Sequence, residues 1–427
     1  MLKIIKSLKY IVKQINMIYT LCRGEKIMIA RPIYIEELKK WQNKDVIKVI
    51  TGMRRCGKST LFDLFIEELK LQGIKDNQII HINLEDADFD FQDYKEFYNY
   101  VNKLIKDEIN YYVFLDEVQM VKDFQKVVDS LYIKKNVDVY ITGSNSTLLS
   151  GELATLLSGR YIKIEMLPLS FKEYVSASDN TNYQNLFLEY MQTGGLPGVV
   201  NVIDTNYNGI DKYLDGIFST VVYKDIMTRE NSMDKLELER ILKFIYDSIG
   251  SQVSINKISN TLTSKGMPIN YYTVDKYINA FLNSYLIYKA ECFDIQGKKL
   301  LEGNYKFYSV DMGLRSFLLG KRANQDMGHI LENIVYLELL RRGYTVYVGK
   351  TKDLEVDFVA KNREGLKYYQ VALSVRDDKV LERELKSLQK TGDFYPKILL
   401  TMDMDLEADY NGIKKINVVD WLLSKEY

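Results

Sequence analysis

VIKVITGMRRCGKSTLFDLFIEELK, residues 46–70, is the stretch that decides the fold. Its apolar opening, Val46–Thr51, predicts a buried strand, and Ser59–Lys70 places leucine and phenylalanine at helical spacing. The residues between them, Gly52–Ser59, match the pattern GxxxxGK[ST] in full. A strand before this pattern and a helix after it are the context that a phosphate-binding P-loop requires. The stretch therefore predicts a P-loop at the start of an α/β sheet.

The residue types of this loop suit a bound triphosphate. Gly52 and Gly57 let the backbone turn tightly, so that N–H groups point at phosphate oxygens. Lys58 supplies a positive charge to the β- and γ-phosphates, and Ser59 offers a hydroxyl to Mg²⁺. The competing interpretation is a glycine-rich turn that matches by chance. We expect ATP and Mg²⁺ as ligands, with contacts from Gly52, Met53, Arg54, Arg55, Cys56, Gly57, Lys58, Ser59 and Thr60.

A second motif, VFLDE at Val113–Glu117, is an apolar strand that ends in two acids. Asp116 is expected to hold Mg²⁺ through water, and Glu117 to polarise the attacking water as a general base. The alternative is a solvated turn. The motif follows the P-loop by one strand–helix unit, which favours the functional interpretation, and the glutamate indicates hydrolysis.

Two further polar positions follow the next predicted strands. The segment Ile141–Asn145 reads ITGSN, and Thr142, Ser144 and Asn145 are all candidates to sense the γ-phosphate. An equal alternative is a capping cluster that opens the next helix. Arg160 is expected to contact phosphate in its own chain, to reach a neighbour's site, or to form an ordinary surface salt bridge.

The order of elements predicts several domains. Strands alternating with helices over residues 28–175 predict a parallel sheet with helices on both faces. We expect a helical linker or lid at 176–230, a winged-helix domain at 231–320 and a small α/β domain at 321–427. Residues 1–27 are basic and lack an unbroken apolar core, so they are expected to be an extension outside the fold and not a signal peptide.

Composition argues against several classes of protein. The 427 residues carry 58 basic and 58 acidic side chains, so a strongly basic nucleic-acid coat is absent. No apolar stretch is long enough to predict a transmembrane helix. Cys22, Cys56 and Cys292 show no CxxC spacing, and with only two histidines no zinc site is expected. A reducing, cytoplasmic setting is the simplest interpretation.

The motifs together resemble a known family. GMRRCGKST, INLED, FLDEVQ, YITGSNSTLLSGEL, LSGRYIKIEMLPLSFKEY and GGLPG occur in this order from about Ile29 onward. They are similar to prokaryotic AAA+-type ATPases of the archaeal-ATPase group, which carry a C-terminal domain of unknown function. The resemblance implies an AAA+-like core, a winged helix and a restriction-endonuclease-like C-terminal domain. By position, it implies Walker A at Gly52–Ser59, Walker B at Asp116 with Glu117, sensor 1 within Thr142–Asn145, and Arg160 in the GR motif.

The C-terminal part keeps only some of the residues that a nuclease of such a fold needs. A restriction-like nuclease brings a helix Glu, a strand Asp and an acid–x–Lys pair to Mg²⁺. This chain has Glu332, then Glu355 and Asp357, but Gln370 replaces the acid and Ala372 the lysine. We expect a scaffold kept for binding, with a protein as its partner, in place of a working nuclease.

The winged-helix part is mildly basic. Double-stranded DNA or packing against protein would both explain its basic and aromatic side chains: Lys257, Lys265, Lys276, Lys298, Lys299, Tyr271 and Tyr272.

Three hypotheses follow for the whole chain. The first is an ATPase that remodels or gates a partner, with DNA as one candidate; the others are a nucleotide-regulated Mg²⁺-dependent nuclease and an ATP-binding signalling switch. No membrane partner is predicted, and homo-oligomerisation is left open.

Overall fold

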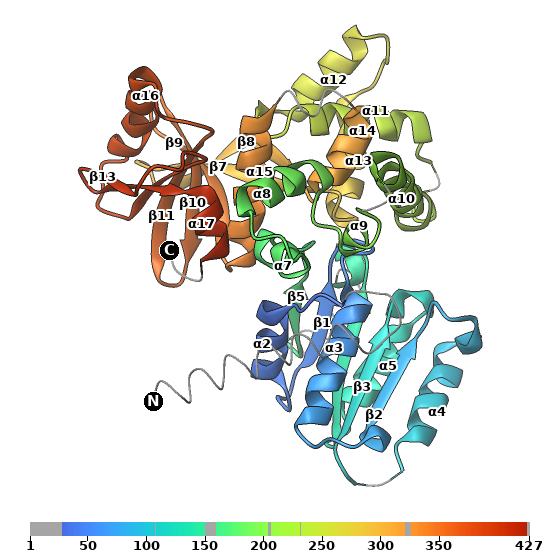
Figure 1. Ribbon diagram of the computed structural model, residues 1–427. Coiled ribbons are helices and arrows are strands. Elements are labelled where there is room, and N and C mark those ends of the chain that lie inside the picture. The colour runs from blue at the N-terminus through green and yellow to red at the C-terminus, as the bar shows by residue number, and fades with distance from the viewer. Residues whose placement is uncertain are drawn as a thin grey trace, which may run out of the picture. The chain divides into compact units, whose positions relative to one another are not determined.

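The computed structural model describes residues 28–106, 108–149, 159–203, 206–230, 232–320 and 326–424 (Figure 1). The predicted extension, residues 1–27, lies outside this part of the chain. The chain forms two compact units, which meet in sequence at Met166 and Leu167. In the described residues, no helix is long and apolar enough to cross a membrane.

The first unit is built on a parallel sheet of five strands in the order β2-β3-β4-β1-β5 (Figure 1). The strands are β1 (Ile47–Thr51), β2 (Ile79–Asn83), β3 (Tyr111–Asp116), β4 (Val137–Gly143) and β5 (Tyr161–Glu165). Strand β1 begins one residue after the predicted start at Val46 and ends at the predicted residue, Thr51. The predicted α/β class with a P-loop sheet is therefore confirmed.

Helices cover both faces of this sheet because the strands are apolar on both sides. Along β3, Tyr112 and Phe114 pack in one core, while Val113 and Leu115 pack in the other. Two helices line the first core, α2 (Pro32–Trp41) and α3 (Lys58–Leu71). Two others line the second, α4 (Tyr94–Leu104) and α5 (Phe124–Tyr132). A strand that alternates between two buried faces reads as continuously apolar, which is how these strands were predicted.

The second unit begins with helices. They are α7 (Phe171–Ser176), α8 (Tyr183–Thr193), α9 (Pro197–Val200), α10 (Asn206–Thr220), a π-helical segment at Val221–Met227, α11 (Lys235–Asp247), α12 (Ile255–Ser264) and α13 (Tyr271–Asn283). In several of these helices, the side chain of the residue just before the first turn caps the helix. The Ser170 hydroxyl accepts a hydrogen bond from the backbone N–H of Glu173 at 3.1 Å, and the Glu173 carboxylate accepts one from the backbone N–H of Ser170 at 2.8 Å. This reciprocal pair satisfies donors that a helix start otherwise leaves free.

A sheet of nine strands forms the centre of the second unit, in the order β13-β14-β12-β11-β10-β9-β7-β8-β6. Its strands are β6 (Gln252–Val253), β7 (Ile287–Asp294), β8 (Lys299–Ser309), β9 (Thr345–Lys350), β10 (Glu355–Asn362), β11 (Gly365–Ala372), β12 (Lys397–Thr401), β13 (Ala408–Tyr410) and β14 (Ile413–Asn417). The helices α14 (Met312–Leu319), α15 (Met327–Arg341), α16 (Asp378–Gln389) and α17 (Val418–Leu423) lie between or after them. The predicted further α/β fold at the C-terminal end is confirmed.

This sheet runs across the predicted boundary at residue 320. In the sequence, the hairpin β7–β8 precedes that boundary and β9 follows it. Strand β9 nevertheless pairs in parallel with β7, with Cys292 opposite Val348 and Asp294 opposite Lys350. Strands predicted to lie in two separate domains thus share one hydrogen-bonded ladder. The pairing joins residues more than 50 positions apart, and no local pattern predicts it.

Candidate active site

The predicted P-loop follows the carboxyl end of β1 and leads into α3. Gly52 and Gly57 have φ angles of +150° and +103°, which favour glycine. A Cβ on Gly52 would lie 2.3 Å from the carbonyl oxygen of Met166, so the loop has no room for a side chain there. The positive end of α3 begins at Lys58, where a helix start can bind an anion.

The loop lies beside two other strand ends. Because β4 lies between β1 and β3 and all three are parallel, their carboxyl ends meet at one edge of the sheet. That edge carries Lys58 and Ser59 from the loop, Asp116 and Glu117 after β3, and Thr142 near the end of β4. The structure therefore brings the central residues of both predicted motifs together.

The Asp116 carboxyl group is buried beside the loop. Its Oδ1 accepts a hydrogen bond from the Thr142 hydroxyl. Its Oδ2 is buried and has no hydrogen-bond partner in the part of the chain that the structure describes. Burial raises the pKa of Asp116, and hydrogen bonds from Ser59 and Thr142 oppose that rise without cancelling it. An unpartnered carboxylate oxygen beside a serine hydroxyl suits Mg²⁺, which takes one or two carboxylates and keeps other positions for water and phosphate.

Glu117 has a strained backbone and a buried carboxylate. Its φ of +52° is left-handed, a conformation that non-glycine residues rarely adopt outside turns and functional sites. Its backbone N–H donates to the Thr142 hydroxyl at 2.9 Å, so one hydroxyl contacts both acids. The Gln119 side-chain amide donates to its Oε2. Burial alone would raise the pKa of Glu117, but Lys58, Gln119 and Arg54 together outweigh burial and lower the pKa.

Lys58 is buried and turned back onto its own loop. Its ammonium group donates to the carbonyl oxygens of Gly52 at 3.1 Å and Met53 at 3.3 Å, and it lies 3.3 Å from Oε1 of Glu117. Burial lowers the pKa of Lys58, but Glu117, Cys56 and Asp116 together outweigh burial and raise the pKa above its ordinary value. The group therefore stays protonated at neutral pH.

The other loop residues have different surroundings. Arg54 is nearly buried and forms an ion pair with Glu85 at 2.7 Å, whereas Arg55 is exposed with a φ of +67°. Cys56 is buried, and its carbonyl oxygen accepts from Arg31 at 3.0 Å. Burial raises the pKa of the Cys56 thiol, which fits a small filler in the loop. Met53 is buried and Thr60 half-buried; their predicted ligand contacts stay predictions.

The three sensor candidates are all buried, but they differ in their contacts. Thr142 contacts Asp116 and Glu117 directly. The Ser144 hydroxyl accepts from the Gln119 amide at 3.4 Å. The Asn145 carbonyl oxygen accepts from the backbone N–H of Leu148 at 3.2 Å, which starts a short 3₁₀ turn. The geometry favours Thr142 as the link between the two acids, and Asn145 as a nucleotide contact stays a prediction.

Arg160 lies at the opposite edge of the sheet. Its carbonyl oxygen accepts from the backbone N–H of Ile47 at 2.8 Å, at the amino end of β1. The five residues of β1 separate that end from the P-loop, at about 3.3 Å each. The guanidinium group forms a half-exposed ion pair with Asp129 at 2.7 Å. Contact with phosphate in its own chain is therefore wrong for this structure, because β5, which begins one residue after Arg160, runs parallel to β1. A role at a neighbour's site stays a prediction.

Two residues near the site were missing from the predicted set. Gln119 holds the Glu117 carboxylate and reaches Ser144, and Glu85 holds Arg54. Both lie inside motifs visible in the sequence, FLDEVQ and INLED. Their signal was present, but a motif does not show which of its side chains points inward.

The predicted DNA-contact residues in the second unit are only partly available. Tyr272 at the start of α13 is 82% exposed. Lys276 forms an ion pair with Glu230 at 2.8 Å and donates to the Ser232 hydroxyl at 2.8 Å. The side chain best placed to meet a partner on this helix is therefore Tyr272.

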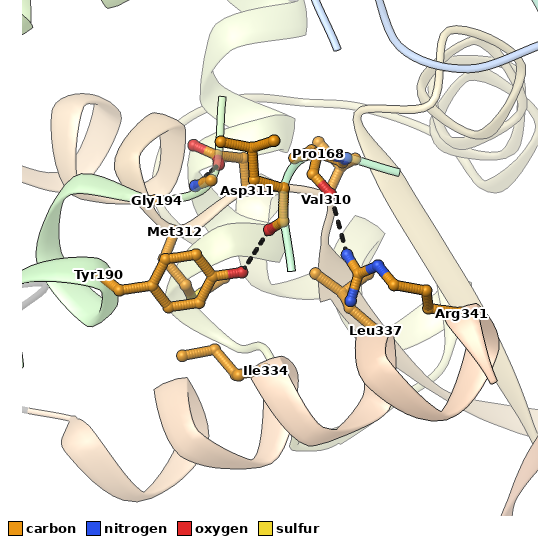
Figure 2. A pocket seen from close by; sticks show the side chains of 11 residues that line it. Pro168, Tyr190, Gly194, Val310, Asp311, Met312, Ile334, Leu337 and Arg341 are labelled. Carbon is orange, nitrogen blue, oxygen red and sulfur yellow. Dashed lines mark hydrogen bonds between the residues drawn. The ribbon is translucent and has the colours of Figure 1, made fainter. Parts of the chain in front are cut away.

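The GGLPG motif belongs to a small pocket within the second unit (Figure 2). The buried Asp311 carboxylate accepts from the backbone N–H groups of Gly195 at 2.6 Å and Leu314 at 3.0 Å. Tyr190 donates to the Leu169 carbonyl at 2.8 Å, and Arg341 to that of Pro168 at 2.9 Å, as Figure 2 shows. The polar groups of the motif are satisfied by the protein itself, which indicates a structural role.

Comparison with known proteins gives the following relatives. The family described as "AAA domain" matches residues 44–175, and a domain of unknown function matches residues 184–325. A protein of Haemophilus influenzae described as uncharacterized is 40% identical over 406 residues, or 93% of this chain and 99% of that protein. One of Methanocaldococcus jannaschii, also described as uncharacterized, is 31% identical over 410 residues, or 90% of this chain and 86% of that protein. The Walker-type ATPase of Pyrococcus abyssi aligns with 70% of this chain and 99% of its own at 14% identity, with a TM-score of 0.49.

The matches and the geometry agree on the first unit. The AAA-domain match covers the parallel sheet, and the P-loop and the Asp116–Glu117 pair lie at one edge of that sheet. The Haemophilus influenzae match extends over nearly the whole of both chains. This chain belongs to one family with these relatives from Haemophilus influenzae and Methanocaldococcus jannaschii, and its first unit is an AAA-type P-loop ATPase domain.

Proposed function

We propose that this protein binds ATP with Mg²⁺ at the P-loop, hydrolyses it, and uses hydrolysis to remodel or gate a bound partner. One observation carries the proposal. At the carboxyl edge of the sheet, the buried Lys58–Glu117 pair lies beside Asp116, whose Oδ2 has no partner among the described residues. A purely structural cluster would be expected to satisfy that oxygen.

Ser59 and Asp116 are the residues that would hold Mg²⁺. Bound Mg²⁺ supplies charge that neutralises the phosphate oxygens as the γ-phosphoryl group is transferred. The raised pKa of Asp116 reflects a carboxyl group buried without a full counter-charge. Ser59 and Thr142 orient that carboxyl group.

Lys58 would bind phosphate oxygens, and Glu117 would accept a proton from the attacking water. Lys58 now donates to two loop carbonyls and pairs with Glu117. Phosphate oxygens in the loop would compete for the same ammonium group, since a lysine is a compact charge with three donors. Because its pKa is lowered, the Glu117 carboxylate is ionised at neutral pH and can accept a proton from water.

Mutation of the loop lysine tests the nucleotide site. Lys58→Ala should reduce ATP turnover to background, because no other side chain of the loop brings a buried ammonium group to the edge. Lys70→Ala is the matched control, since Lys70 lies on the same helix and forms half-exposed pairs with Glu67 and Asp76. A steady-state phosphate-release assay measures both. Unchanged turnover in Lys58→Ala would remove the site assignment.

Glu117→Gln separates binding from hydrolysis. The amide keeps the shape of the side chain but cannot accept a proton, so turnover should fall by roughly 100-fold or more. Binding of ATP, followed with a fluorescent analogue, should remain measurable. If turnover survives, Glu117 is not the general base and another group activates the water.

The partner is proposed from the surface of the second unit. The candidates are double-stranded DNA bound at α12–α13 and a protein bound at the C-terminal part. ATP hydrolysis in the first unit would act on whichever partner is bound. Tyr272→Ala should weaken salt-sensitive duplex binding in an anisotropy titration if DNA is the partner. If the wild-type protein does not bind duplex DNA even at low salt, a protein remains as the proposed partner.

A further inference from the structure

A buried lysine lies among three carboxylates in the second unit. Lys306 on β8 is only 3% exposed at its side chain. Its ammonium group is 2.9 Å from Oε1 of Glu332 on α15, 2.6 Å from Oε1 of Glu355 on β10 and 3.9 Å from Oδ1 of Asp357 on the same strand. These are the three acids that the sequence analysis assigned to a nuclease-like metal site. Lys306 was not predicted there.

The surrounding groups hold this arrangement in place. The Tyr308 hydroxyl donates to Oε1 of Glu332 at 2.8 Å, and the backbone N–H of Val371 donates to Oδ2 of Asp357 at 2.9 Å. Gly250 leaves space for Glu332, because a Cβ there would lie 2.9 Å from its Oε2. The carboxylates are thus oriented from outside the cluster, as metal ligands are.

On one side the cluster is partly exposed. Lys350 donates to Oε2 of Glu355 at 3.0 Å, and both side chains are 29% exposed. The Gln252 amide donates to the same oxygen. A hydrated ion could therefore reach Glu355 from solvent, while Glu332 and Asp357 lie deeper.

The charges of the cluster nearly balance with the lysine in place. Burial lowers the pKa of Lys306, but Glu332, Asp357 and Glu355 together outweigh burial and raise it. Burial and the nearby Glu332 raise the pKa of Asp357 well above its ordinary value. By formal charge, the ammonium groups of Lys306 and Lys350 offset two of the three carboxylates.

We propose that Glu332, Glu355 and Asp357 form a cation site whose resident cation is the ammonium group of Lys306, so that the lysine keeps divalent metals out. An ammonium group neutralises carboxylates but cannot act as a Lewis acid or generate a metal-bound hydroxide. The described residues contain no group of three or more His, Cys, Asp or Glu side chains that could hold a metal ion as they stand. Removing the lysine is the change that would free three oxygen ligands of the kind that Mn²⁺ and Mg²⁺ prefer.

Lys306→Met in the full-length, nucleotide-free protein tests the proposal, with Mn²⁺ as the probe. Methionine is also unbranched, is one heavy atom shorter than lysine, and carries no charge. Every protein also carries Asp116→Asn, which removes the metal ligand proposed for the nucleotide site. Bound Mn²⁺ is counted by electron paramagnetic resonance, and Tm is measured with and without Mn²⁺. The matched control is Lys350→Met, which removes the partly exposed ammonium group that contacts the same Glu355.

Lys306→Met should bind one additional Mn²⁺ and gain Tm on adding it, and Asp357→Asn in that background should abolish both effects. Lys350→Met should behave like the parent protein. If Lys306→Met binds no more Mn²⁺ than its parent, the proposal is wrong.

A second comparison needs only proteins that retain Lys306. Asp357→Asn alone should leave Mn²⁺ binding of the parent unchanged, because the cluster holds no exchangeable cation. A loss of bound Mn²⁺ in that variant would show that the cluster binds metal beside Lys306 and would overturn the proposal. This comparison decides the question even if Lys306→Met does not fold.

Discussion

At the scale of single residues, one hydroxyl organises the candidate ATPase site. Thr142 donates to Asp116 and accepts from the backbone N–H of Glu117, which holds a strained left-handed φ. Both contacts are buried, so neither can be replaced by water at low cost. Thr142 therefore acts as a positioning residue for the two acids.

Thr142→Val should keep the shape of this site and remove both hydrogen bonds. We expect the free energy of unfolding to fall by about 1–3 kcal/mol, the usual cost of leaving buried polar groups unpaired. ATP turnover should fall by about tenfold or more. Misplacing either acid would raise the activation free energy, and a rise of about 1.4 kcal/mol slows a reaction tenfold. Urea unfolding and phosphate release measure the two changes. Thr261→Val, whose hydroxyl bonds only to a carbonyl within α12, is the control.

Asp311 predicts a pH dependence of stability in the second unit. Burial raises its pKa to about 6 despite hydrogen bonds from the backbone of Leu314 and Gly195. The folded state therefore binds more protons than the unfolded state between about pH 4 and pH 6. Through this group, the free energy of unfolding is highest below pH 4 and decreases as pH rises through 6.

Asp311→Asn should remove this contribution. Urea unfolding of the wild type and the variant from pH 4 to pH 7 gives the difference in stability at each pH. The advantage of the wild type should shrink as pH rises through about 6. A constant difference would show that Asp311 keeps its charge throughout, with its backbone donors outweighing burial.

At the scale of elements, the GGLPG turn shows how a motif can be structural. A Cβ on Gly195 would lie 2.5 Å from the Leu169 carbonyl oxygen, and one on Gly194 would lie 2.4 Å from the Asp311 carboxylate. The turn needs glycine because backbone and carboxylate approach it from two sides. The GGLPG motif is easy to recognise in the sequence, but packing within the second unit explains why its glycines are needed.

Gly195→Ala should lower the free energy of unfolding by about 1–3 kcal/mol, as overpacking typically does. Gly216→Ala is the matched control, because nothing lies within 4 Å of a Cβ at that position of α10. Alanine there should be neutral or stabilising by up to about 1 kcal/mol. Chemical denaturation of both variants measures the contrast. Equal effects would mean that the turn can relax around a methyl group.

At the scale of the whole molecule, the nine-stranded sheet joins segments that look separate in the sequence. The hairpin β7–β8 continues into β9 and the strands beyond it, so no sheet edge falls at residue 320. Cutting there would expose two unpaired strand edges, which favour aggregation.

We therefore expect residues 167–427 to fold as one piece and residues 231–320 to fail alone. Expression of both fragments, followed by circular dichroism and thermal unfolding, checks this. The longer fragment should show one cooperative transition. A cooperative fold for the short fragment would mean that β7 does not need its pairing with β9.

The sequence alone determined the first unit and the composition of its central site. Five apolar strands alternating with helices, a complete P-loop pattern and an acidic pair after the third strand are local features, and the α/β fold that they predict is confirmed. Local patterns suffice because parallel strands place their carboxyl ends at one edge, whatever the details of packing.

Only the tertiary structure decided which side chains meet across long distances in the chain. It selected Thr142 among three polar neighbours and put Arg160 at the far edge of the sheet. It also brought Lys306 to Glu332 and Glu355, residues 26 and 49 positions away in the sequence. Such contacts depend on strand order and register, and hydrophobic periodicity contains neither.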